Sequence, residues 1–251
     1  MSPFESCPKW PPSPCDEHAE NSAAAAATRT VATTADENVS TAEPVASTTA
    51  STPGPAAVLD FWFPKGRNTG DFQLWYQGGK ELDAKIIDQF GNTNVAARKG
   101  ELNHWRSSAD GALALTIVLD QFTRQIYRGT GDAFSADTLS RQTVRESLKK
   151  GYDESWSVFE LSFGIVMPLM HSEDLEDHKF LAKYLNDRIE ASDSKEFKEA
   201  MQGNLKFEVD HREMIEKFGR YPYRNKSLGR ENTAEEEEYL SSLPPEKRYG
   251  Q

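Results

Sequence analysis

Charged and imidazole side chains gather in three short runs of this 251-residue sequence. The first run is LDQFTRQIYRG, residues 119–129, in which Asp120 and Arg124 stand four residues apart. On a helix this spacing puts both side chains on one face, where they can pair, and Arg128 extends the same face. An arginine fork matches the geometry of a carboxylate or a phosphate. The run therefore supports two interpretations, an anion clamp or an ion pair that sets the register between helices.

The second run, MPLMHSED at residues 167–174, places an imidazole beside carboxylates. His171 and Asp174 stand three residues apart where a helix is expected to begin. A histidine that a carboxylate orients can serve as a general base, so these two residues are the candidate acid–base pair, and Asp120 is a third candidate for catalysis. The alternative is that His171 bonds to the end of a neighbouring helix. His211 supports the same two interpretations, and its core-facing position on a long expected helix favours the structural one.

The third run, FGRYPYRN at residues 218–225, follows that long helix as a loop. Its candidate binding residues are Arg220, Arg224 and Asn225, because polar loop residues serve function more often than packing. The alternative is that the arginines cap the last carbonyl groups of the helix. The arginines of the first and third runs together are more numerous than structural ion pairs alone usually require in an acidic protein. If they converge, they form a basic pocket suited to a small anion.

A metal site is a weaker alternative. Its ligands would be Glu160, His171, Asp174 and His211, a carboxylate and imidazole set that suits Zn²⁺, Mn²⁺ or Fe²⁺. The four residues of this set do not themselves form a His-Glu-x-x-His or Glu-x-x-His spacing, so we predict no metal site and leave the cofactor unknown. The sequence also contains no glycine-rich phosphate loop and no Gly-x-Ser-x-Gly elbow.

Charge and hydropathy restrict the partners. The net charge of −11 argues against nucleic acid and anionic membranes, because both require a basic surface. No segment approaches the ~20 apolar residues that span a bilayer. The first residues show no charged-then-apolar signal pattern, so we expect a cytoplasmic protein. The partners that remain are a small anionic ligand or a peptide.

Composition divides the chain into a tail and a domain. Residues 1–55 are rich in Pro, Ala, Ser and Thr without a period, which predicts a disordered low-complexity tail. Cys7 and Cys15 both lie in this tail, which excludes a thiol nucleophile, a disulfide or a cysteine zinc site in the folded domain. Helical periods dominate residues 56–241, with no strand alternation, and residues 242–251 form a short C-terminal tail. We therefore predict an all-α, antiparallel helical array in a single domain.

Start and stop signals locate the expected helices. The predicted helices are 57–63, 80–90 with Gly91 as its stop, a short one to Lys99, one from Ser108, 135–150, 156–167 ending at Pro168, one capped by Ser172, one from Asp193 to Phe218 with Gly219 as its stop, and a last one capped by Thr233 with Glu236. A dense aromatic group at residues 72–76 is expected to lie in the core.

Five runs of sequence carry a resemblance to a known family. They are VLDFWF (58–63), LDQFTRQIYRGT (119–130), PLMHSEDL (168–175), HREMIEKFGRYPYRN (211–225) and LGREN (228–232). The domain resembles the "domain of unknown function 924" family over about residues 56–241. The family usually has proline at Thr123, and histidine or proline-histidine at Tyr223. The resemblance implies a tetratricopeptide-like helical fold and implies no activity, since the family is named for an unknown function.

Two functional hypotheses follow from these patterns. The first is an enzyme or binder of a small anionic metabolite, in which arginines clamp the ligand and His171 with Asp174 exchanges protons. The second is a non-catalytic interaction scaffold, in which a concave tetratricopeptide-like surface holds a peptide and the charges are structural.

Overall fold

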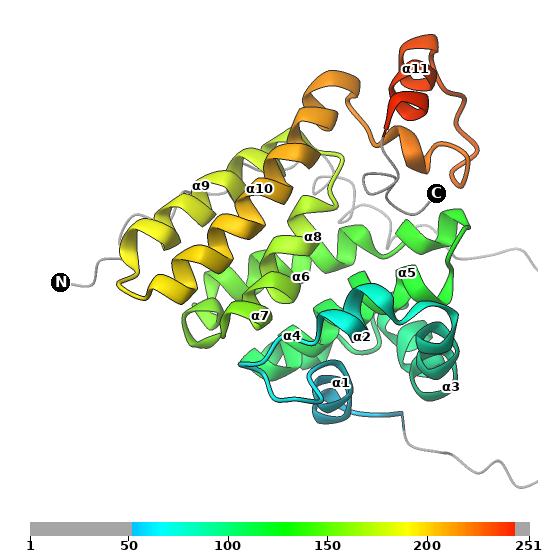
Figure 1. Ribbon diagram of the computed structural model, residues 1–251. Coiled ribbons are helices and arrows are strands. Elements are labelled where there is room, and N and C mark those ends of the chain that lie inside the picture. The colour runs from blue at the N-terminus through cyan, green and yellow to red at the C-terminus, as the bar shows by residue number, and fades with distance from the viewer. Residues whose placement is uncertain (1–51, 244–251) are drawn as a thin grey trace, which may run out of the picture. The chain divides into compact units, whose positions relative to one another are not determined.

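The computed structural model describes residues 52–243, which form one compact unit (Figure 1). The predicted tails, with Cys7 and Cys15, lie almost wholly outside the described residues. Between residues 52 and 243 the chain forms helices and loops and no strand, which confirms the all-α prediction. A specifically tetratricopeptide-like arrangement stays a prediction. No helix among these residues combines the length and the apolar character needed to cross a membrane.

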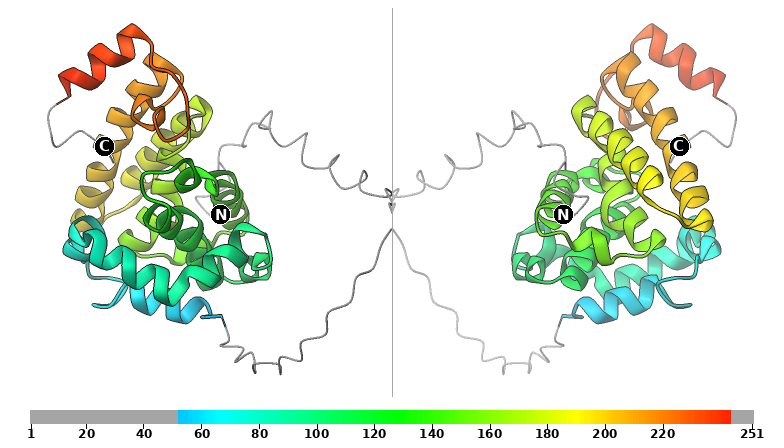
Figure 2. Two further views of the ribbon diagram at one scale, coloured as in Figure 1. Left: turned by 90° about the vertical axis from the view of Figure 1, so that its right-hand side faces the viewer. Right: turned by 90° about the vertical axis from the view of Figure 1, so that its left-hand side faces the viewer.

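The helices follow one another with short connections. They are α1 (Pro55–Trp62), α2 (Phe72–Gln77), α3 (Gly79–Arg98), α4 (Ala109–Ile117), α5 (Thr123–Ile126), α6 (Asp137–Lys149), α7 (Val158–Leu161), α8 (Met167–Met170), α9 (Leu175–Ala191), α10 (Lys195–Phe218) and α11 (Ala234–Ser242). Helix α4 is apolar on all sides, and it is buried against α1, α6 and the segments around them. Helices α9 and α10 form a long hairpin, and their side-by-side packing is visible in every view (Figures 1 and 2).

Two helical runs contain a wider, π-helical turn. Val118–Phe122 joins α4 to α5, and Ser162–Val166 joins α7 to α8. In the second turn the N–H of Met167 donates to the carbonyl of Ser162, five residues earlier. The prediction that this helix ends at Pro168 was wrong. Proline lacks an N–H and collides with the carbonyl four residues back in a regular α-helix, and we attribute its tolerance here to the wider turn that precedes it.

Several predicted helix ends are confirmed. The hydroxyl of Ser108 accepts a hydrogen bond from the N–H of Gly111 at the start of α4. Gly219 ends α10 with a left-handed backbone, φ 68°, which a residue without a Cβ adopts at little cost. Thr233 and Glu236 form the predicted capping box of α11.

Other predicted ends were wrong. Gly91 does not stop a helix, because α3 continues past it with buried side chains at Phe90, Asn94 and Ala97 on one face, and their burial outweighs the conformational cost of glycine. Helix α9 is capped by Asp174 and not by Ser172. Helix α10 is capped by Ser194 rather than Asp193, one residue later than predicted.

The aromatic group near α2 is only partly core. Trp75 is buried, and its indole N–H donates to the carbonyl of Trp62 at 2.8 Å. Phe72 and Tyr76 are 60% and 63% exposed, which contradicts the expectation of burial. Phe72 packs edge to face on Trp75 and stacks on Tyr76, so the three rings share one side of α2, and of the three only Trp75 is buried. These exposed rings border the cavity described below.

Candidate functional site

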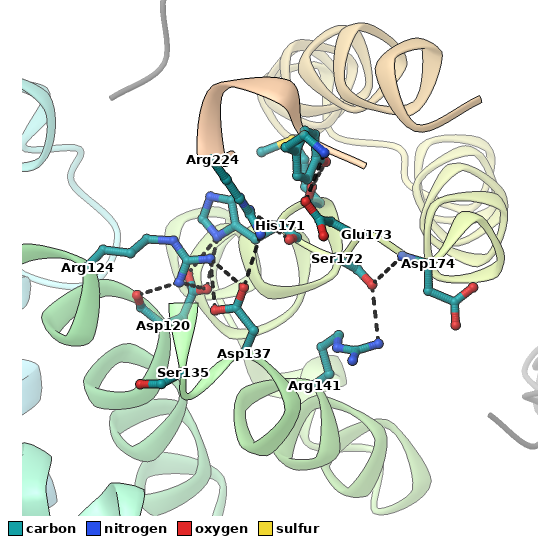
Figure 3. Close-up of polar contacts among 12 residues, drawn as sticks. Asp120, Arg124, Ser135, Asp137, Arg141, His171, Ser172, Glu173, Asp174 and Arg224 are labelled. Carbon is teal, nitrogen blue, oxygen red and sulfur yellow. Dashed lines mark hydrogen bonds and ion pairs between the residues drawn. The ribbon is translucent and has the colours of Figure 1, made fainter. Parts of the chain in front are cut away.

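His171 and Asp120 form a hydrogen-bonded pair (Figure 3). His171 follows α8 directly, and its Nδ1 lies 2.9 Å from Oδ1 and 3.1 Å from Oδ2 of Asp120. Asp120 lies in the first π-helical turn and is fully buried, so its carboxylate fixes the imidazole with Nδ1–H as the donor. The remaining nitrogen, Nε2, makes no hydrogen bond to another described residue. This arrangement exposes the basic nitrogen of a histidine that is already oriented.

The predicted partner of His171 was wrong. The carboxylate of Asp174 instead accepts a hydrogen bond from the N–H of Glu176 at 3.0 Å. The start of a helix leaves its first N–H groups without intrahelical acceptors, and the Asp174 carboxylate supplies one of them. Asp174 therefore caps α9 and does not orient the imidazole.

Two arginines and a second aspartate extend the pair into a chain. Arg124 contacts Asp120 Oδ1 at 2.8 Å, as its spacing predicted, and Asp137 Oδ1 at 3.0 Å. Arg224, at the end of the short helix Pro222–Arg224, lies 3.4 Å from Asp137 Oδ2 and donates to the carbonyl of His171 at 2.8 Å. Asp137 is the first residue of α6. Each arginine is thus neutralised by a carboxylate, and these contacts connect four segments of the protein.

The electrostatics of this chain keep His171 neutral. Burial raises the pKa of Asp120, but Arg124 and the imidazole outweigh burial and hold it well below its usual value. Burial and then the charge of Arg124 lower the pKa of His171, and the Asp120 carboxylate only partly opposes them. At neutral pH we therefore expect an ionised Asp120 and an uncharged imidazole whose Nε2 carries a lone pair.

His171 opens onto a cavity of about 630 Å³. Its walls come from α2, from the run α7 to α8 and from α10. The rings that line it are Phe72, Trp75, Tyr76, Phe159, Phe163 and Phe207. Met167, Met170, Ser162 and Asn204 add further surface, and among the described residues no Asp, Glu, Lys or Arg lines the cavity. The lining is therefore mainly apolar, and its polar side chains are hydroxyl, amide and imidazole groups.

The second imidazole of the cavity belongs to His211. Its Nδ1 lies 2.7 Å from the carbonyl of Phe207, one turn earlier on α10, so Nδ1–H donates there. Burial, with smaller contributions from His171 and His178, lowers the pKa of His211 to about 4, and the hydrogen bond to Phe207 opposes this shift only in part. His211 is consequently neutral at physiological pH and brings no charge to the cavity.

The predicted basic pocket is wrong, because the four arginines do not converge. Arg128 forms a two-pronged pair with Asp83 on α3, at 2.7 and 2.8 Å. Arg220 pairs with Glu236 on α11 at 2.7 Å and does not cap the preceding helix. The amide of Asn225 donates to Asn232 at 2.7 Å, within the same C-terminal part of the chain. Only Arg124 and Arg224 meet, at Asp137.

The alternative metal set is also separated. Glu160 accepts a hydrogen bond from the N–H of Ser157 in a capping box and lies 3.2 Å from Arg67. Within residues 52–243, no three His, Cys, Asp or Glu side chains are grouped so that they could hold a metal ion.

Sequence reasoning missed several parts of this site. Asp137, which joins the two arginines, has no local signal beyond an acidic residue at a helix start. Gly203 and Phe207 line the cavity from the middle of α10, where apolar periodicity alone does not distinguish a cavity wall from a packed face. Thr123, where the family usually has proline, bonds to Asn94 at 2.8 Å and leaves the Asp120–Arg124 pair intact.

The chain has relatives of unknown function. Residues 58–243 match the family model described as bacterial protein of unknown function (DUF924), and the chain belongs to this family. The solved structure titled "Structure of Protein of Unknown Function ATU0120 from Agrobacterium tumefaciens" is similar, with 30% identity and a TM-score of 0.61. That match covers 75% of this chain and 97% of the other. A comparison with curated proteins finds no significant match.

Proposed function

We propose that the cavity binds a small molecule and that His171, oriented by Asp120, is its general base. The observation that carries this proposal is the Nδ1 contact to a fully buried carboxylate, which leaves Nε2 as the basic nitrogen of a residue that lines an apolar cavity. A neutral imidazole in such surroundings accepts a proton from a bound hydroxyl, amine or activated carbon. Pockets with apolar walls and few convergent polar groups are the usual sites of small ligands.

The experiment measures the reactivity of His171 in the full chain with diethyl pyrocarbonate, which acylates unprotonated imidazole. Mass spectrometry locates the modified histidines. We expect His171 to react, with a rate that falls only below pH 6.5, since its pKa is lowered. His104, which is exposed, should react as a reference, and His178, which is fully buried, should not.

A matched variant tests the role of Asp120. The Asp120→Asn change removes the negative charge that raises the pKa of His171, so the pH at which reactivity falls should move lower. An unreactive His171 beside a reactive His104 would contradict the proposal. So would a pH profile that places the pKa of His171 above 7, because a protonated imidazole is no base at neutral pH.

A second function, peptide binding by a non-catalytic scaffold, is favoured by the cavity border. Phe72, Tyr76 and Phe207 line the cavity and are each more than half exposed, at 60%, 63% and 56%. An apolar side chain of a bound peptide could insert between such rings. Protection of His171 from acylation by peptides but by no compound in a small-molecule library would favour this scaffold function.

A further inference from the structure

We infer that the ligand of this cavity is an uncharged aromatic compound with one hydrogen-bond-donating hydroxyl group, and that it is not an anion. This inference rests on the proposed function, because it identifies the class of molecule that the same cavity would bind. It replaces the anionic ligand that the sequence predicts. Three features of the cavity carry it, namely its charge, its polar atoms and its walls.

The charge of the site argues against an anion. The two arginines connected to the Asp120–His171 pair, Arg124 and Arg224, do not line the cavity, and both bond to Asp137. Their charges are balanced by Asp137 and Asp120, while the imidazoles are neutral. A carboxylate ligand would leave water without gaining a cation, and burying an unpaired charge is unfavourable. An uncharged ligand avoids this cost.

The polar atom that the proposed base presents to a ligand selects a donor. Because Nδ1–H of His171 points at Asp120, the nitrogen left for a ligand is the acceptor Nε2. The Ser162 hydroxyl is already engaged: it donates to the carbonyl of Val158 at 2.9 Å and accepts from Asn204 at 3.0 Å. A hydroxyl on the ligand satisfies Nε2, whereas an oxyanion would place one lone pair against another. This contact also delivers the ligand proton to the proposed base.

The walls of the cavity suit aromatic rings. Trp75 packs against Phe163 and Phe159 with ring centroids 4.8 and 5.5 Å apart, and Phe72 meets Phe159 edge to face at 6.0 Å. A planar ligand can add to this cluster by offset or edge-to-face contacts. Met167 and Met170 also line the wall, and methionine side chains interact favourably with aromatic rings. At about 630 Å³ the cavity has room for a fused two-ring compound.

The test compares three probes that share one ring system, namely 2-naphthol, 2-naphthoate and naphthalene. Binding to the full chain is measured by ligand-observed NMR at pH 7.5 and at raised salt, so that the net negative charge of the protein does not decide the result. We expect 2-naphthol to bind at least about tenfold more tightly than 2-naphthoate. In the His171→Phe variant, 2-naphthol should weaken to the level of naphthalene, while naphthalene binding changes little.

A second variant keeps the inference testable if His171→Phe does not fold. Gly203 lines the cavity on α10, and a Cβ added there meets no atom within 4 Å. The Gly203→Leu change should therefore occupy part of the cavity and reduce 2-naphthol binding. The same change at Gly91 on α3, where a Cβ also meets nothing, should leave binding unchanged.

The outcomes separate the two proposals. Binding of 2-naphthoate as tight as, or tighter than, 2-naphthol, and sensitive to Gly203→Leu, overturns the ligand class but leaves the cavity as a ligand site. Binding that Gly203→Leu does not alter, or no binding by any probe, overturns this inference. A His171 that is also unreactive toward diethyl pyrocarbonate then overturns the proposed function as well.

Discussion

The stability of two glycine variants tests whether the cavity is open and apolar. Gly203 and Gly91 both lie inside long helices, and a Cβ at either position meets no atom within 4 Å. Replacing glycine by leucine in a helix interior stabilises the folded state by about 0.8 kcal/mol through helix propensity. Both Gly203→Leu and Gly91→Leu should gain this amount. Gly203→Leu alone should be stabilised further, because its leucine side chain enters the cavity.

The additional gain follows from apolar burial. Full burial of a leucine side chain is worth about 1.5–3 kcal/mol, and a cavity that opens to solvent should give about half of this. We therefore expect Gly203→Leu to exceed Gly91→Leu by about 1 kcal/mol in the free energy of unfolding. In a domain of this size the excess raises the unfolding temperature by about 2–4 °C.

Urea and thermal unfolding of the full chain measure both variants against the parent. Equal stabilisation at the two positions would mean that the Gly203 side chain stays in solvent. A loss of stability at Gly203 beside a gain at Gly91 would mean that the space is already filled. Either result would refute the description of the cavity on which the ligand proposals depend.

Two further predictions concern the charged groups of the site. The Asp137→Ala variant leaves Arg124 and the 4%-exposed Arg224 without their shared carboxylate, so urea unfolding should show that the free energy of unfolding falls by about 3–5 kcal/mol. The control variant Asp187→Ala breaks only the exposed pair with Lys183 and should lower it by less than about 0.5 kcal/mol. Similar losses in the two variants would contradict the role of Asp137. The pKa of His211 is lowered to about 4 in the folded protein. As the pH falls below 6.5, the unfolded chain therefore binds a proton at His211 and the folded protein does not, so the free energy of unfolding decreases until about pH 4. The His211→Asn variant, whose amide can still donate to Phe207, should lose about 2–3 kcal/mol less than the parent between pH 7 and 4.5, and an unchanged pH slope would show that His211 is not neutral in the fold.

Local signals in the sequence were sufficient for much of the fold. Ser108, Gly219 and the Thr233–Glu236 box lie where helices start or stop, because their chemistry acts within one helical turn. The Asp120–Arg124 pair was predictable for the same reason, since four residues separate its members. The partner of His171 was not, because Asp120 stands 51 residues away in sequence. A nearer acid, Asp174, satisfied the spacing rule but is used as a cap.

The partners of the four arginines, like the partner of His171, could not be predicted from sequence spacing because they depend on the tertiary structure. Residue types alone suggested that many cations in an acidic chain would gather around a ligand. In the fold each of the four meets an acidic residue from another element, Asp83, Asp137 or Glu236. These carboxylates are separated from the arginines by tens of residues or lie in other helices. The number of charged residues in the sequence therefore could not show which acid each arginine contacts. The cavity walls likewise depend on how α2 and α10 pack, which periodicity does not specify.

Both π-helical turns contribute residues to the proposed site. Asp120 lies within the first turn, and Ser162 and Phe163 of the second line the cavity. A π-helical turn adds a residue to the helical repeat and so rotates the following side chains relative to those before it. In the first run, the N–H of Thr123 donates to the carbonyl of Val118, five residues back, and the Thr123 hydroxyl bonds to the same oxygen. Such turns are less favourable than a regular helix and concentrate at functional sites. Their position beside the Asp120–His171 pair is therefore better explained by a requirement of the site than by packing alone.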